Sequence, residues 1–224
     1  MTFARNIGTL PEYAPVRPEG PVKLHDVKLA PNPRRVRIFL AEKGIEVPMA
    51  PLDLLAFDQR SPDYARVNPF LKAPALELDD GRVITESIAI CRHFEEAKPE
   101  PPLFGRSARE RVDVEMWQRR VEFELFYNVA QTYRHTHPAA EKLEGKQVPE
   151  WAQSCRARAL VAMAVFDAAL DGREFVAGDS FSVADITGLV ALDFCRPARI
   201  AIPPELSRLV AWRDRLAARP SAKA

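Results

Sequence analysis

Cysteine is scarce in this chain of 224 residues, which has only Cys91, Cys155 and Cys195. The three lie far apart and form no Cys-x-x-Cys pair, which excludes a zinc ribbon and a disulfide-stapled scaffold. The four histidines show no His-Glu-x-x-His spacing, so no metal site is expected. An odd number of isolated thiols is typical of a reducing compartment, and we expect a cytoplasmic protein.

Charge of one sign and long apolar runs are also lacking. Lys and Arg number 32 against 31 Asp and Glu, a net charge of +1, whereas a nucleic-acid-binding surface needs a basic excess. No run approaches the roughly 20 apolar residues that span a bilayer, and residues 1–21 lack the apolar stretch of a signal peptide. The sequence therefore predicts a globular protein that binds neither nucleic acid nor membrane.

Proline, in contrast, is abundant and unevenly placed. Of the 20 prolines, most precede Leu103, and none lies between Leu103 and His137 or between Glu150 and Arg196. Because proline is excluded from helix interiors, the second half can hold long helices, while the first half consists of short elements. The sequence predicts an extended leader at 1–21, a first domain at 22–98, a linker at 99–106 and an all-helical domain at 107–224.

The first domain alternates strands and helices. Proline in the first turn and Gly44 at the end bound its first helix. Asp79-Asp80-Gly81 between two apolar runs is a strong hairpin signal. The expected order is β-α-β-α-β-β-α, with strands at 22–26, 47–52 (an edge strand), 75–78 and 82–85, and helices at 33–43, from 61, and at 87–97.

The sequence predicts a second domain that is helical throughout. One long helix is expected at 107–135, with an apolar stripe made of Val114, Trp117, Val121, Leu125 and Val129. Helices are also expected at 150–170 and from about 202 to 219. Between them, Ser182 and Asp185 have the spacing of a capping box, in which each side chain accepts from the other residue's backbone N–H.

Four motifs occur in a fixed order, namely Arg34-Arg-Val-Arg-Ile-Phe-Leu-Ala-Glu-Lys-Gly44, Asn68-Pro-Phe-Leu-Lys-Ala-Pro-Ala-Leu76, Thr85-Glu-Ser-Ile-Ala-Ile90 and the Ser182–Asp185 box. With the element order, they make residues 22–224 resemble the cytosolic glutathione S-transferases. The residues of the four motifs are most similar to those of the theta-like branch of bacteria and fungi. The resemblance implies an α/β + α fold, a thioredoxin-like domain followed by an all-helical glutathione transferase C-terminal domain.

The resemblance also implies a glutathione site in the first domain. Pro74 stands where the family carries a cis proline, and the backbone of Ala73 would then pair with the peptide backbone of glutathione. Glu86 and Ser87 match the pair that binds the γ-glutamyl end at a helix start. The alternatives are an ordinary trans proline and a serine that only caps its helix.

Lys72 and Gln59 match positions whose side chains meet the glycine carboxylate of glutathione. The alternative is that both are solvated loop residues.

The usual thiol-activating residue of the family is missing. The serine or cysteine position falls on Ala30 and the tyrosine position near Asp26, and neither can donate a hydrogen bond to a thiolate at pH 7. Asn32 at the following helix start could hold the thiolate with its amide and the first-turn N–H groups, or could only cap the helix. Tyr133 and His135, near the end of the long helix, are a second candidate source, with His137 beside them.

We therefore expect a glutathione S-transferase-like transferase that uses glutathione as co-substrate and conjugates its thiolate to a small hydrophobic electrophile in detoxification. A non-catalytic glutathione-binding or interaction protein is the alternative, and a thiol-disulfide oxidoreductase ranks third because no cysteine lies near Ala30. A homodimer is expected, because in some classes an aromatic residue four positions before the cis proline plugs a pocket on the partner, and Phe70 holds that position here. The alternative is that Phe70 packs on its own domain.

Overall fold

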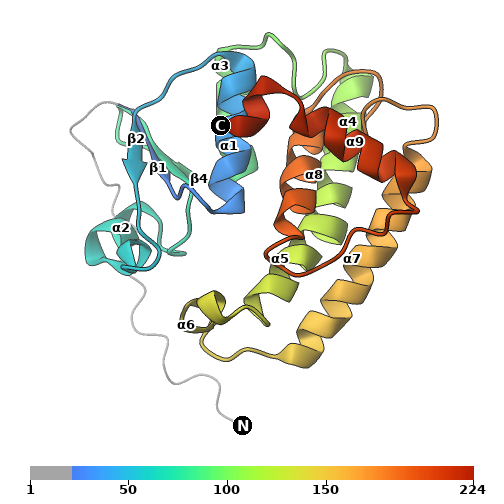
Figure 1. The fold of residues 1–224 in the computed structure, drawn as a ribbon. Helices are drawn as coiled ribbons and strands as arrows, with labels where there is room; N and C mark the ends of the chain where they lie inside the picture. Colours follow the sequence, from blue (N-terminus) through green and yellow to red (C-terminus); the bar gives the residue numbers. More distant parts are fainter. Residues whose placement is uncertain (1–21) are drawn as a thin grey trace. The chain divides into compact units, whose positions relative to one another are not determined.

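The computed structural model describes residues 22–224; the predicted leader at 1–21 lies outside the described residues. The described chain forms two compact units (Figure 1). The sheet unit comprises residues 22–33 and Glu46–Ile90, and the helical unit comprises Arg34–Ile45 and Cys91–Ala224. Two helices of the predicted first domain thus run on into the helical unit, while the domain boundaries at 98 and 107 stay a prediction.

The sheet unit is built on four short strands, β1 (Lys23–Asp26), β2 (Met49–Pro51), β3 (Ala75–Glu77) and β4 (Val83–Thr85). Their order is β2-β1-β3-β4, with β1 parallel to β2 and antiparallel to β3, and β3 antiparallel to β4. β2 lies at an edge, as its prolines predicted, because proline cannot donate to a second neighbour. The predicted hairpin is confirmed, and the N–H of Gly81 (φ 87°) donates to the Leu78 carbonyl oxygen at 3.1 Å.

The helices of the predicted first domain are α1 (Pro31–Lys43), α2 (Pro62–Val67) and α3 (Ser87–Ala97), with a short 3₁₀ turn, η1 (Asp58–Arg60). α1 begins two residues before the predicted position, because Pro31 also fits a first turn. α2 begins as predicted, since Ser61 Oγ accepts from the Tyr64 N–H at 3.2 Å. The predicted order β-α-β-α-β-β-α is confirmed.

The predicted long helix is confirmed as three consecutive stretches, α4 (Ala108–Arg120), the π-helical η2 (Val121–Phe126) and α5 (Tyr127–Arg134). The wider π-helical turns leave carbonyl groups that Asn128 binds, because its Nδ2 donates to the carbonyl oxygens of Phe123 at 3.1 Å and Glu124 at 2.8 Å. Every residue of the predicted apolar stripe is buried.

The rest of the helical unit consists of η3 (Pro138–Ala140), α6 (Glu141–Glu144), α7 (Pro149–Ala169), α8 (Val183–Phe194), α9 (Ser207–Ala217) and η4 (Pro220–Lys223). The predicted capping box at Ser182 and Asp185 is confirmed at the start of α8, whose residues 183–192 are all buried. The predicted start of the last helix at 202 is wrong, because Pro203 and Pro204 interrupt it and α9 begins at Ser207.

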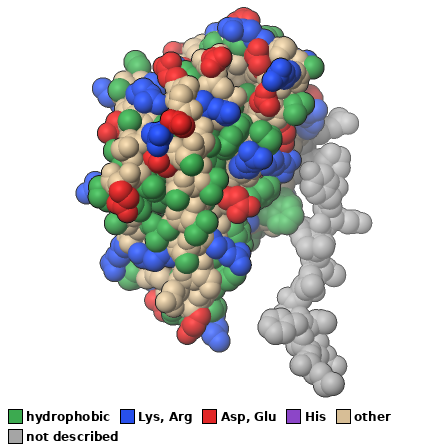
Figure 2. All heavy atoms as spheres, turned by 90° about the vertical axis from the view of Figure 1, so that its right-hand side faces the viewer, with side chains coloured by type: hydrophobic (Ala, Val, Ile, Leu, Met, Phe, Trp, Pro, Cys, Tyr) green, Lys and Arg blue, Asp and Glu red, His purple; other side chains and the backbone are tan. Residues whose placement is uncertain are grey.

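The surface carries both signs of charge. On the face that Figure 2 shows, Lys and Arg side chains are interspersed with Asp and Glu. In the part of the chain that the structure describes, no helix is long and apolar enough to cross a membrane, and no group of three or more His, Cys, Asp and Glu residues could hold a metal ion.

Candidate functional site

One end of the sheet gathers the residues that the sequence singled out for glutathione. β1 and β2 are parallel and end together, because Asp26 lies opposite Pro51. β3 pairs Ala75 with Thr85, so the residues before Ala75 and after Thr85 lie at the same end of the hairpin. Segments that leave this end of the sheet unit carry Asn32, Gln59, Lys72, Ala73, Pro74, Glu86 and Ser87.

The backbone is strained beside these residues. Phe57, Leu71 and Glu86 have φ of 61°, 56° and 67°, in the left-handed region that side chains other than glycine rarely adopt. Among the described residues only Arg199 shares this property outside glycine. Such strain clusters at functional sites, and here it lies next to Gln59, Lys72 and Ser87.

The loop before β3 presents a backbone donor. The Lys72 carbonyl oxygen accepts from Tyr64 Oη at 2.7 Å and from Asn68 Nδ2 at 2.6 Å. The N–H of Ala73 donates to none of residues 22–224. The Ala73–Pro74 bond is cis, as predicted, while the role of Pro74 in binding glutathione stays a prediction. Sequence reasoning assigned no role to Tyr64 or Asn68, although Asn68 opens one of the four motifs.

Ser87 does not cap α3. Glu86 stands before the helix, since its carbonyl accepts from the Ile90 N–H at 3.0 Å, and Ser87 is the first helical residue. The Ser87 side chain is buried, yet it makes no hydrogen bond to any described residue. A capping serine would precede the helix and accept from an N–H two or three residues on. The hydroxyl and the N–H groups of the first turn are therefore available to an anion.

Gln59 is buried in η1, with 4 % of its surface exposed. The alternative of a solvated Gln59 is therefore wrong. Its Oε1 has no partner within the described chain, and buried polar atoms almost always have one. Lys72 is exposed, which agrees equally with a solvated lysine and with one that meets a ligand carboxylate.

The start of α1 offers fewer N–H donors than a first turn without proline would. Pro31 and Pro33 have no N–H, and the N–H of Ala30 donates to the Val27 carbonyl at 2.9 Å. Asn32, the second residue of α1, therefore supplies the N–H of this first turn together with its side-chain amide. Its place inside the helix also argues against the alternative that it is the cap, because a cap residue precedes the first turn.

Tyr133 and His135 lie in the helical unit and have partners there. The Tyr133 ring stacks on His137 at 4.6 Å and packs against Phe194 at 5.0 Å, and burial raises the pKa of Tyr133. A raised pKa keeps its hydroxyl protonated and able to donate. His135 Nδ1 accepts from the Val148 N–H at 3.3 Å. Catalytic roles for Tyr133 and His135 stay a prediction.

Comparison with known proteins gives matches to both parts of the chain. The glutathione S-transferase N-terminal domain family matches residues 30–97, and the C-terminal domain family matches residues 129–220. Glutathione S-transferase 2 of Saccharomyces cerevisiae is 36% identical over 203 residues, which cover 89% of this chain and 87% of that protein. The chain belongs to the glutathione S-transferase family.

Solved structures of this family extend the comparison. A glutathione S-transferase domain-containing protein of Marinobacter aquaeolei VT8 is 40% identical with a TM-score of 0.86, over 89% of this chain and 98% of that one. Gtt2 of Saccharomyces cerevisiae is 36% identical with a TM-score of 0.86, over 90% and 98%. The expected fold and the expected class, a glutathione S-transferase-like transferase, are therefore confirmed.

Proposed function

We propose that this glutathione S-transferase binds glutathione at the end of the sheet and adds its thiolate to a small hydrophobic electrophile. The observation that carries the proposal is the set of unpaired polar groups there. Within the described residues, the Ala73 N–H, the Ser87 hydroxyl and the Gln59 Oε1 have no hydrogen-bond partner. Unpaired groups in this number at one place are expected where a polar ligand binds.

Each group suits one part of glutathione. The Ser87 hydroxyl and the N-terminal N–H groups of α3 would take the γ-glutamyl carboxylate, where the helix dipole favours an anion. Glu86 is exposed and would pair with the ammonium group. The Ala73 backbone would pair with the central peptide like an added strand. Lys72 and the Nε2 of Gln59 would donate to the glycine carboxylate, whereas Gln59 Oε1 is an acceptor and would take an N–H of the ligand.

We propose that Asn32 stabilises the thiolate form of bound glutathione. Its N–H and its side-chain amide stand at the positive end of α1, and both hydrogen bonding and the dipole lower the pKa of a bound thiol. The hydroxyl of Tyr133 and the ring of His135 are the second source. We further propose that the protein acts in the cytoplasm, in detoxification.

Calorimetric titration with glutathione tests the site. Wild-type protein should bind glutathione in the micromolar to millimolar range. Ser87→Ala should weaken binding by about 1–3 kcal/mol, because the ligand carboxylate then loses a donor. Ser154→Ala, an exposed serine on α7, is the matched control and should leave affinity unchanged. Equal affinities for wild type and Ser87→Ala would show that the site is misplaced.

A non-catalytic glutathione-binding protein is the second candidate, and Ala30 is the observation that favours it. An aryl-halide conjugation assay separates the two. The transferase should raise the conjugation rate above that of free glutathione, whereas a binding protein would bind glutathione without doing so. The oxidoreductase alternative fits less well, because all three cysteines are free and buried.

We also propose a homodimer that docks through Phe70. This side chain is 74 % exposed, so it does not pack on its own domain as the alternative required. The ring is therefore accessible to a partner subunit, as the classes of the family that dock through this position require.

A further inference from the structure

We propose that Tyr64 and Asn68 are positioning residues for glutathione. They hold the Lys72 carbonyl by two hydrogen bonds, so that the N–H of Ala73 faces the ligand. The inference rests on the proposed function, since it concerns the same site.

Two buried donors converge on one carbonyl. Tyr64 and Asn68 are each 3 % exposed, and their Oη and Nδ2 lie 2.7 and 2.6 Å from the Lys72 carbonyl oxygen. Tyr64 comes from α2, whereas Asn68 follows it, so two points of the chain fix this carbonyl. Asn68 Oδ1 also accepts from the Phe70 N–H at 3.0 Å, which restrains the loop before Lys72 as well.

The geometry of the peptide group transmits this restraint to Ala73. The Lys72–Ala73 peptide is trans, and in a trans peptide the C=O and the next N–H lie in one plane and point in opposite directions. A carbonyl that is drawn toward Tyr64 and Asn68 therefore turns the Ala73 N–H away from them. That N–H meets no acceptor in the described chain. A donor that binds a ligand is expected to lack a partner within the protein.

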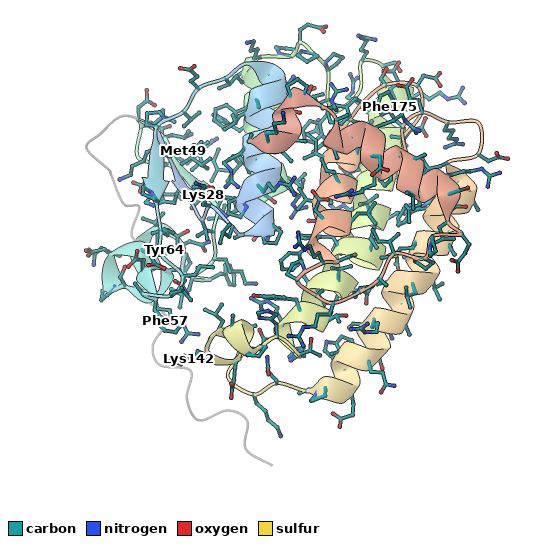
Figure 3. All side chains as sticks on the ribbon, viewed as in Figure 1. Lys28, Met49, Phe57, Tyr64, Lys142 and Phe175 are labelled. Atoms are coloured by element: carbon teal, nitrogen blue, oxygen red, sulfur yellow. The ribbon has the colours of Figure 1, made fainter. Side chains whose placement is uncertain are left out.

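The Tyr64 donor is itself held in place. Its ring packs edge-on against His25 of β1 at 5.3 Å, and His25 Nε2 bonds Glu77 of β3. Burial raises the pKa of Tyr64, so its hydroxyl stays protonated and donates at every physiological pH. Figure 3 shows Tyr64 on α2, away from Met49 at the start of β2.

The need for a restraint follows from the loop. Residues 68–74 belong to no helix or strand, and Leu71 takes φ of 56° within them. Without the two donors, the Lys72–Ala73 peptide could rotate and pair its N–H with water. Glutathione would then have to reorder the peptide on binding, which lowers affinity without changing the chemical step.

The test uses the full chain and S-methylglutathione, which cannot react. Tyr64→Phe keeps the ring against His25 and removes the hydroxyl, and it should raise the calorimetric Kd about fivefold, as expected for one lost hydrogen bond. Asn68→Asp keeps the acceptor for Phe70 and should raise Kd further, because a carboxylate oxygen then faces the Lys72 carbonyl. Tyr127→Phe, on α5, is the control and should bind as wild type does.

Steady-state conjugation separates positioning from mere stability. Tyr64→Phe should raise KM for glutathione about fivefold and leave kcat at saturating glutathione within twofold of wild type. A variant that is only less stable would lose kcat with KM unchanged, and that outcome would overturn the inference, as would a Tyr64→Phe Kd equal to wild type. Wild-type protein that fails to bind S-methylglutathione would instead overturn the proposed function, and the inference with it.

Discussion

Gly188, in the middle of α8, is the position where one added methyl group should do most damage. A Cβ there would lie 2.1 Å from Trp212 Cη2, 2.9 Å from Cζ2 and 3.1 Å from Cζ3. Trp212 is fully buried, and its Nε1 donates to Asp185 Oδ1 at 3.0 Å. The indole therefore cannot move aside without leaving its hydrogen bond.

The expected change in the free energy of unfolding is the sum of one stabilising and two destabilising contributions. Replacing a helical glycine by alanine would by itself stabilise the fold by about 0.5–1 kcal/mol. Overpacking costs about 1–3 kcal/mol, and a weakened hydrogen bond from Trp212 to the buried Asp185 carboxylate costs about 1.5–3 kcal/mol. Gly188→Ala should thus lower the free energy of unfolding by about 3 kcal/mol, opposite in sign to the usual helix effect.

Urea unfolding followed by far-ultraviolet circular dichroism measures this change. The midpoint should fall with little change in the slope m. Trp212→Phe supplies the control background, because a phenyl ring lacks the three atoms that the Cβ would meet. In that background Gly188→Ala should cost less than about 1 kcal/mol. A wild-type-like midpoint for Gly188→Ala, or an equal loss in both backgrounds, would refute the reasoning.

The remaining predictions concern the thiol, the dimer and the response to acid. Asn32→Ala should raise the pKa of the bound glutathione thiol and lower kcat/KM tenfold or more, while glutathione binding is mostly kept. Ala30→Ser should raise the conjugation rate. Unchanged thiolate absorbance in both variants would show that the sulfur lies elsewhere. Phe70→Ser should shift light scattering from dimer to monomer, and a wild-type protein that is already monomeric at micromolar concentration would exclude the dimer. Burial alone would raise the pKa of Glu42, but hydrogen bonds from Arg219 and a serine outweigh it and lower that pKa. The stability that the Glu42 carboxylate contributes is therefore full above about pH 4.3 and is lost as the pH falls through the lower folded pKa. Glu42→Gln should thus lose less stability in acid than the wild type does. Urea midpoints that fall equally with pH in the two proteins would contradict this.

Local patterns predicted most of the fold. The hairpin followed from Asp79-Asp80-Gly81, and the start of α8 followed from the Ser182–Asp185 box, because turn and cap geometry depend on neighbouring residues. The buried stripe on α4, η2 and α5 followed from helical spacing. The scarcity of donors at the start of α1 was also readable, since Pro31 and Pro33 stand in the sequence.

Local patterns failed where a residue's neighbours come from elsewhere in the chain. The sequence left open whether Gln59 is a ligand group or a solvated loop residue, and whether Ser87 is a ligand group or a helix cap; in the fold Gln59 is buried and Ser87 lies inside the helix. In both cases the residue type allows two environments, and packing selects between them.

The sequence by itself determined the order of the elements and the family resemblance, because these depend on propensities and on spacing along the chain. Tertiary structure alone decided which polar groups are satisfied. Lys43 shows this clearly, since the sequence marks it only as the last residue of a helix before Gly44. In the fold it is buried, forms an ion pair with Glu95, and donates to the carbonyl oxygens of Lys98 and Pro99 at 2.8 and 3.0 Å. A buried charge is stable only with such partners, and α3 and the proline-rich segment after it reach Lys43 only when the chain has folded.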